Sequence, residues 1–386
     1  MNPLLQTITS ELTDNIKTHF HHLHQNPEMS FEEHQTAAYI AEQLKSWGYE
    51  VTAGIGKTGV VGRLKVGDGK ASIGLRADTD ALPVKEAVDL PYKSKVEGKS
   101  HTCGHDAHTS MLLGAAEYLA KTKNFNGTLN VIFQPAEEIM GGAPAMIKDG
   151  LFERFPMDYV FGLHNMPGLE LGKIYFTGGP IMAAVDNWEI ELTGKGSHGS
   201  MPEKSIDPLV AGAALVMSLQ TIVSRNVAPK DSAVVSVGAF LSGDAGNVIP
   251  QTAILRLSVR NSTPATRVMV LDKIKSITKA TAEAYNVTFE IREGQPGAIL
   301  INDEAQTEKC IQIAAEVLGA DNVVTPGPTF MGSEDFAFYA QQRPCVYGFI
   351  GNGDTPMVHH PMYAFDETNL PIGAAYWVGI AQNYLR

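Results

Sequence analysis

The feature that most limits the fold of this chain is an alternation of short apolar runs with helical patterns in its first half. The apolar runs occupy residues 60–64, 71–75, 129–133 and 159–163, and a helical pattern over 107–121 separates two of them. Short apolar runs bounded by glycine or polar residues are typical of buried strands. Strands that alternate with helices favour a sheet covered by helices, so we predict an α/β protein.

Helical patterns also open the chain, over residues 8–24 and 32–47. The pattern changes near residue 186, where a second series of elements begins. Its order is strand, helix, two strands, helix and strand, over residues 188–192, 208–223, 233–240, 253–259, 265–285 and 287–293. This β-α-β-β-α-β order is typical of a ferredoxin-like unit.

The length of the chain supports a second domain. It has 386 residues, and single hydrophobic cores stop growing at about 250 to 300 residues. We therefore predict a two-domain α/β protein in which the ferredoxin-like α+β domain is inserted into the larger one. The predicted domains are an outer domain over 1–184 and 298–386 and an inserted domain over 185–297.

Charge and cysteine content exclude several classes of partner. The net charge of −12 disfavours nucleic-acid binding, which depends on an excess of Lys and Arg. No N-terminal leader pattern and no apolar run long enough to span a bilayer is visible, so no membrane association is expected. Cys103, Cys310 and Cys345 are widely spaced and odd in number, which does not suggest a disulfide framework. A cytoplasmic location is the expectation.

The strongest chemical signal is a group of metal-ligand side chains at the start of the helical pattern over 107–121. His101, Cys103, His105 and His108 lie within eight residues of one another. Thiolate and imidazole together suit zinc, manganese, cobalt or nickel rather than magnesium or calcium. The alternative interpretation is a polar surface loop with or without a reactive thiol.

Further candidate ligands follow predicted strands or lie near the end of the chain. Glu137 and Glu138 follow the strand over 129–133, and His164 follows the strand over 159–163. Ligands of open α/β sheets gather at the carboxyl ends of the strands, so these side chains are expected at one rim. The pair His359 and His360 comes later. Each of these signals is weak by itself, and their shared placement gives them weight.

The adjacent carboxylates suggest a division of roles. Neighbouring side chains of an extended segment point in different directions, so one carboxylate can bind metal while the other faces a metal-bound water. A metal lowers the pKa of bound water from about 16 to about 7. A carboxylate beside that water can take its proton and deliver it to a leaving amine, as amide hydrolysis requires.

Asp78 and Asp80 end another predicted strand at the same rim. An acidic side chain there could orient a ligating imidazole without touching the metal. A strand-end turn capped by aspartate accounts for these residues equally well.

These segments together resemble the amidohydrolase branch of the aminoacylase and carboxypeptidase metallopeptidases. The resemblance spans essentially the whole chain and rests on residues 74–83, 101–108, 134–138, 162–167, 197–202, 246–250, 333–336 and 360–361. It implies two divalent metal ions, from among zinc, manganese, cobalt and nickel, with Cys103 bridging them. The implied ligands are Cys103, His105, Glu138, His164 and His360.

The resemblance also implies roles around the metals. Glu137 is the implied general base, and Asp78 the implied acid that orients a ligating histidine, with Asp80 the less favoured choice. The inserted domain is implied to be a lid that mediates a homodimer, with a tetramer as the alternative. His198 is implied to reach the substrate carbonyl, in many members from the second subunit.

The expected reaction is hydrolysis of the amide bond of a small N-acyl amino acid, N-benzoyl or N-acetyl. Arg260 and Asn247 are expected to bind the free carboxylate of this substrate, because one guanidinium pairs with one carboxylate. A carboxypeptidase or dipeptidase and a deacetylase of N-acetyl-diaminopimelate type are the alternatives of the same class. A catalytically silent binding protein would require the loss of a ligand or of the base.

Overall fold

The computed structural model describes residues 2–386, which form two compact units. Unit 1 comprises residues 1–179, 301–328 and 335–386, and unit 2 comprises 180–300 and 329–334. The sequence placed the boundaries at 184/185 and 297/298 and gave 329–334 to the larger domain. The short strands β7 (Gly179–Met182) and β14 (Leu300–Asn302) lie where the chain passes from one unit to the other.

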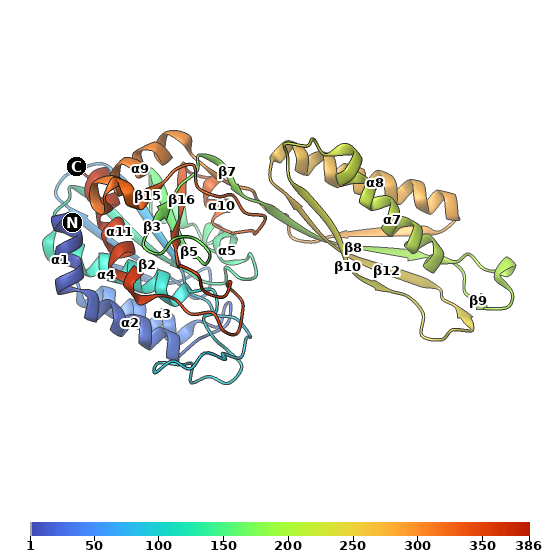
Figure 1. The fold of residues 1–386 in the computed structure, drawn as a ribbon, viewed down its shortest axis with the longest axis horizontal. Helices are drawn as coiled ribbons and strands as arrows, with labels where there is room; N and C mark the ends of the chain where they lie inside the picture. Colours follow the sequence, from blue (N-terminus) through green and yellow to red (C-terminus); the bar gives the residue numbers. More distant parts are fainter. Residues whose placement is uncertain (1) are drawn as a thin grey trace. The chain divides into compact units, whose positions relative to one another are not determined.

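Unit 1 contains a mixed β-sheet with helices packed around it (Figure 1). The sheet has eight strands in the order β1-β2-β4-β3-β5-β16-β6-β15. The strands are β1 (Glu50–Ile55), β2 (Gly59–Val66), β3 (Ser72–Asp78), β4 (Gly127–Gln134), β5 (Tyr159–Met166), β6 (Ile174–Tyr175), β15 (Val323–Val324) and β16 (Cys345–Gly351). The central strands β4, β3, β5 and β16 are parallel to one another. They are nearly all buried, as expected for strands covered on both faces.

The helices of unit 1 are α1 (Pro3–Glu11), α2 (Thr13–Gln25), α3 (His34–Ser46), α4 (His105–Thr122), α5 (Gly142–Lys148), α6 (Leu151–Arg154), α9 (Glu304–Leu318), α10 (Ala337–Ala340) and α11 (Leu370–Tyr384). The helix predicted over 8–24 is instead two helices that meet at Leu12. Helix α4 is buried along most of its length because α2, α11 and β3 all pack against it. It therefore holds its first turn firmly against the sheet.

Unit 2 has the predicted order β8 (Ala184–Thr193), α7 (Pro208–Asn226), β10 (Ala233–Leu241), β12 (Thr252–Asn261), α8 (Pro264–Tyr285) and β13 (Thr288–Glu293). Its antiparallel sheet has the strand order β10-β12-β8-β13. The alternating apolar residues of β8 and β12 pack against the two helices in a separate core. The short strands β9 (Ser197–His198) and β11 (Val248–Ile249) pair in an arm beyond one end of this sheet (Figure 1). The prediction of an α/β protein with an inserted α+β domain is confirmed.

Candidate metal centre

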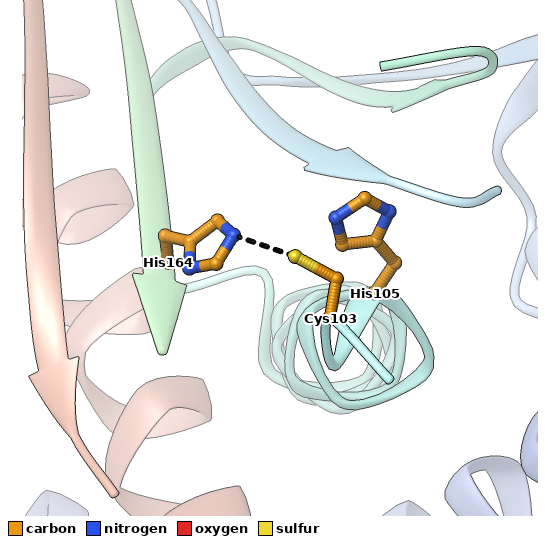
Figure 2. A group of neighbouring side chains, drawn as sticks. All are labelled: Cys103, His105 and His164. Carbon is orange, nitrogen blue, oxygen red and sulfur yellow. Dashed lines mark hydrogen bonds between the residues drawn. The ribbon is translucent and has the colours of Figure 1, made fainter. Parts of the chain in front are cut away.

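The site lies at the carboxyl ends of the parallel strands in unit 1. Cys103 precedes α4, His105 begins it, and His164 is near the end of β5. One ligand atom of each lies within 4.8 Å of the others, and all three side chains are buried. The Cys103 Sγ is 3.5 Å from the His164 Nε2. Figure 2 draws this contact as a dashed line, with His105 beside it. Two segments far apart in the sequence thus bring three donor groups together.

The two adjacent glutamates complete this cluster from the segment after β4. Glu137 Oε2 and Glu138 Oε1 are each 3.9 Å from the His105 Nε2. Glu137 is 7% exposed, so its carboxylate lies where solvent access is restricted. Both carboxylates face the imidazole, so the sequence was right to group them with the motif of α4.

Hydrogen bonds fix which ring nitrogen of each histidine faces the cluster. The His105 Nδ1 lies 3.2 Å from the Asp80 Oδ1, and the His164 Nδ1 bonds the Asn165 carbonyl. Because an acceptor occupies Nδ1, the Nε2 atom of each ring is left for another partner. This arrangement is the usual way in which a protein orients imidazole ligands of a metal.

The donor atoms that point into the cluster fit a bound cation. Within residues 2–386, the His105 Nε2 and the Glu138 Oε1 are buried without a hydrogen-bond partner. Buried polar atoms are rarely left in that condition unless an ion or water satisfies them. Thiolate, imidazole and carboxylate together form a donor set for zinc and its neighbours in the transition series.

The protonation of the cluster is coupled to cation binding. Burial and the negative charge of Glu138 raise the pKa of the Cys103 thiol well above its ordinary value. Burial and the neighbouring His108 hold the pKa of His164 well below its ordinary value. Before a cation enters, the thiol is therefore protonated and His164 is neutral. Binding of a cation to the thiolate releases that proton, so affinity rises with pH.

The structure corrects the predicted choice between the two adjacent histidines near the C-terminus. His359, not His360, lies beside Cys103 and Glu138, with its Nε2 3.3 Å from the Glu138 Oε2. Its backbone N–H donates to the Thr102 carbonyl, and its φ of 68° turns the chain there. Both histidine side chains are exposed, and the Nδ1 of His360 accepts the N–H of Met362. The side chains of neighbouring residues point in different directions, and the sequence gave no reason to prefer His359 over His360.

The structure favours Asp80 over Asp78 as the acid that orients His105, although the Asp78 Oδ2 also lies 3.9 Å from the His105 Nε2. Asp80 contacts His105 and also accepts the backbone N–H groups of Glu137 and Glu138, at 3.1 and 3.0 Å. Burial raises the pKa of Asp80, but the bonds from His105 and other donors outweigh it and lower this pKa. Asp78 instead pairs with His108 at 2.7 Å and with Arg76 at 2.7 Å. Asp80 therefore orients the candidate ligand His105.

Asn165 is a buried residue whose side chain contacts several parts of the site, and sequence reasoning did not identify it. Its amide donates to the Cys103 carbonyl at 2.7 Å and lies 3.0 Å from the His108 Nε2. The Tyr363 hydroxyl donates to its side-chain oxygen at 2.8 Å. A Cβ atom on Gly104 would come within 2.4 Å of both Asn165 and Tyr363, which accounts for the glycine inside the motif. The position of Asn165 directly after His164 was the available signal.

A second buried group missed from the sequence anchors α4 from the other side. His24 lies 2.6 Å from the Asp106 Oδ2 through Nδ1 and 2.9 Å from the Glu86 Oε1 through Nε2. Burial lowers the pKa of His24, but the two carboxylates raise it to about 9. The charged imidazole therefore ties α2 and the segment around residue 86 to the first turn of α4.

The predicted substrate-binding residues lie in unit 2 and are not all together. His198 and Asn247 share the arm, where the Gly199 N–H donates to the Asn247 carbonyl at 2.8 Å. Arg260 lies near the opposite end of β12, and its guanidinium donates to the Met331 carbonyl at 2.9 Å. Strands rise about 3.3 Å per residue, so the eight residues from Thr252 to Arg260 separate the two ends by about 26 Å. Asn247 and Arg260 of one chain therefore cannot bind the same carboxylate, contrary to expectation.

Comparison with known proteins identifies the family of this chain. Residues 74–383 match the model of peptidase family M20/M25/M40. The chain is 47% identical to a hippurate hydrolase of Campylobacter jejuni over 95% of both chains. It is 39% identical to an N-acetyl-L-cysteine deacetylase of Bacillus subtilis, covering 92% of this chain and 85% of the relative.

A solved structure from Bacillus subtilis, described as a dinuclear metal-binding peptidase of the M20 family, has a similar fold. It is 32% identical, with a TM-score of 0.85, over 97% of this chain and 98% of that one. The prediction of an enzyme that uses two divalent metal ions is confirmed. The chain belongs to peptidase family M20/M25/M40.

Proposed function

We propose that this enzyme hydrolyses the amide bond of N-acyl amino acids, releasing a free amino acid and a carboxylic acid. The observation that carries the proposal is the buried cluster of Cys103, His105 and His164. The His105 Nε2 and the Glu138 Oε1 lack a hydrogen-bond partner there, and the Glu137 carboxylate lies beside them. Among its relatives, the hippurate hydrolase and the N-acetyl-L-cysteine deacetylase act on substrates of this class by name.

The residues that would hold the two cations are Cys103, His105, Glu138, His164 and His359. When bound, the cations supply Lewis acidity and lower the pKa of a water molecule to about 7. Cys103 lies in two of the groups of neighbouring donor side chains and would contribute its thiolate to the centre. His359 replaces His360 in this set because His359 lies beside Cys103 and Glu138.

Glu137 is the proposed general base. Its carboxylate lies beside the cluster, and its backbone N–H is fixed by Asp80. A carboxylate in this position takes a proton from the attacking water and returns it to the nitrogen of the leaving amine. Since both transfers use one side chain, its orientation decides the rate of the chemical step.

Arg260 is the proposed partner of the substrate carboxylate. Its guanidinium is half-buried and makes bonds to Met331 and Ser333, which leave donors free for bidentate pairing. His198 and Asn247 lie on the arm of unit 2, about 26 Å along β12 from Arg260. We therefore propose that the arm of a second copy, rather than that of the same chain, supplies these two residues.

The exposed apolar surface of unit 2 supports the proposal of a homodimer formed through that unit. Helix α7 is long and apolar enough to cross a membrane by composition, yet only 33% of that window is buried. Leu209, Val210 and Met217 of α7 are 39%, 49% and 70% exposed. Strand β10 is an edge strand with Phe240 and Leu241 also exposed. A second copy would cover both the apolar side chains and the unpaired edge.

A cytoplasmic location is also proposed. Cys103, Cys310 and Cys345 are all free and buried. Free thiols are usual in a reducing compartment, where disulfides are rare.

The proposal is tested by a panel of substrates with the enzyme loaded separately with zinc, manganese, cobalt or nickel. N-benzoyl and N-acetyl amino acids should be cleaved, and the carboxamides of the same substrates should be cleaved at least tenfold less well, because Arg260 loses its charged partner. Free dipeptides cleaved faster than every N-acyl amino acid would replace the proposal with a dipeptidase. No turnover of any member of the panel with any of the four metals would refute an amidohydrolase.

A further inference from the structure

We infer that Glu33 is a positioning residue for the Glu137 carboxylate, which it controls by holding Ala136 in a left-handed backbone conformation. The inference rests on the proposed role of Glu137 and extends it to a residue 104 positions earlier in the chain. Glu33 is not part of the cluster of candidate ligands. Its effect is carried by the backbone of the segment that follows β4.

Glu33 is a buried carboxylate with two defined partners. The residue is 1% exposed. Its Oε1 accepts the backbone N–H of Ala136 at 2.9 Å, and its Oε2 accepts the Thr58 hydroxyl at 2.6 Å. Thr58, itself buried, thus fixes the rotation of the carboxylate that receives the Ala136 N–H. A charged acceptor makes such bonds shorter and stronger than a neutral one does.

Capping of α3, the structural role that Glu33 could have taken, is carried out by another residue. Glu33 is the N-cap of α3, but its side chain makes no capping bond to that helix. Glu28 caps α3 instead, accepting the N–H groups of Gln35 and Thr36 at 3.1 and 2.8 Å. The Glu33 side chain therefore turns away from its own helix toward a segment about a hundred residues later.

Ala136, the residue that receives this bond, has an unfavourable backbone conformation. Its φ is 52°, in the left-handed region that favours glycine. The conformation turns the chain so that the next two N–H groups, of Glu137 and Glu138, both reach Asp80. Three consecutive N–H groups are thus divided between two buried carboxylates. Strained backbone of this kind persists only where surrounding bonds determine it.

Loss of the Glu33 acceptor should let Ala136 return to an ordinary conformation and move Glu137. The left-handed region disfavours alanine enough to change a population about 5- to 30-fold. We expect Glu33→Ala to lower kcat by about that factor, with KM changed less than about twofold because no proposed substrate contact is altered. Glu28→Ala is the matched control, since it removes a nearby carboxylate that accepts two backbone N–H groups of α3 and makes no bond to Ala136. It should lower the melting temperature and leave kcat unchanged.

The decisive variant is Glu33→Ala combined with Ala136→Gly. Glycine adopts the left-handed conformation without the cost that alanine has. The double variant should regain at least fivefold of the lost kcat, although it gains no bond. Because glycine at this φ also removes strain from the folded chain, the melting temperature of each variant is measured, and kcat is compared at a temperature at which all of them remain folded. Glu33→Gln, which keeps an oxygen for the Ala136 N–H, should retain kcat within about threefold and serves if Glu33→Ala does not fold.

A second measurement does not depend on turnover. Amide hydrogen exchange of a peptide covering residues 134–142 should lose protection in Glu33→Ala and keep it in Glu28→Ala. Normal protection in Glu33→Ala, a normal kcat, or a loss that Ala136→Gly fails to repair would each overturn the inference. An inactive wild type with the expected exchange pattern would instead refute the proposed function and leave the positioning of residue 136 supported.

Discussion

Replacement of Asp80 tests whether this residue orients the candidate ligand His105. In the folded chain the Oδ1 atom of Asp80 contacts the His105 Nδ1 and the Glu137 N–H, and its Oδ2 accepts the Ser30 hydroxyl and the Glu138 N–H. Asp80→Asn keeps one oxygen and places an NH₂ group where the other was. The consequence depends on which pair of donors then faces the NH₂ group.

The hydrogen-bond geometry selects the less costly orientation. With the NH₂ group on the Oδ2 side, the Ser30 hydroxyl can rotate and accept, so only the Glu138 N–H loses its acceptor. One buried unsatisfied donor costs about 1 to 3 kcal/mol, a sizeable part of a total stability of about 5 to 15 kcal/mol. His105 keeps a neutral acceptor, so metal affinity should fall by about tenfold in Asp80→Asn and about 100-fold in Asp80→Ala, the two ends of the usual range.

Calorimetric titration of the metal-free protein with Zn²⁺ or Mn²⁺ measures the affinity, and urea unfolding measures the stability. Ser30→Ala is the control, because it removes one donor and leaves the other bonds of Asp80 in place, so affinity should change by less than about threefold. Asp78→Asn should mainly lower stability, since the buried Arg76 loses a charged partner. A greater loss of metal affinity in Asp78→Asn than in Asp80→Ala would refute the assignment of Asp80 to His105.

Three further predictions address the base, the ligand and the pH dependence. Glu137→Gln should keep wild-type metal content by elemental analysis and lose at least about 10²-fold in kcat; near-normal turnover would exclude Glu137 as the base. His359→Ala should lower metal occupancy while His360→Ala keeps it, and the opposite result would restore the sequence-based choice. The pKa of His24 is raised from 6.5 to about 9 in the folded state. Its contribution is therefore complete below pH 6.5 and lost as the pH rises through about 9, so the stability difference between wild type and His24→Gln should shrink by about 3 kcal/mol over this range; a constant difference would refute the charged form of His24.

Much of the site was accessible from the sequence because it depends on where strands end. Glu137, Glu138 and His164 follow buried runs, and the carboxyl ends of parallel strands must meet at one rim. Cys103 and His105 were accessible because a cysteine and three histidines within eight residues are hard to account for by packing alone. The inserted domain was visible as a change in the order of strand and helix patterns.

Choices between neighbouring residues were not accessible, and there the structure favours the residue that the sequence did not single out. Asp80 rather than Asp78 contacts His105, and His359 rather than His360 lies beside Glu138. In each pair the two residues are of the same type, and only the direction of the side chain differs. That direction depends on backbone angles, such as the φ of 68° at His359, which short-range sequence patterns do not specify.

The sequence by itself determined the α/β class, the inserted unit and the chemistry of the donor groups, because apolar periodicity and ligand type are local properties. Only the tertiary structure decided which donors meet and what holds them. The bond from Glu33 to Ala136 joins residues 103 positions apart, and Asn165 joins segments 62 positions apart through the Cys103 carbonyl. Such buried polar contacts are set by the packing of whole elements against one another, so no local pattern records them.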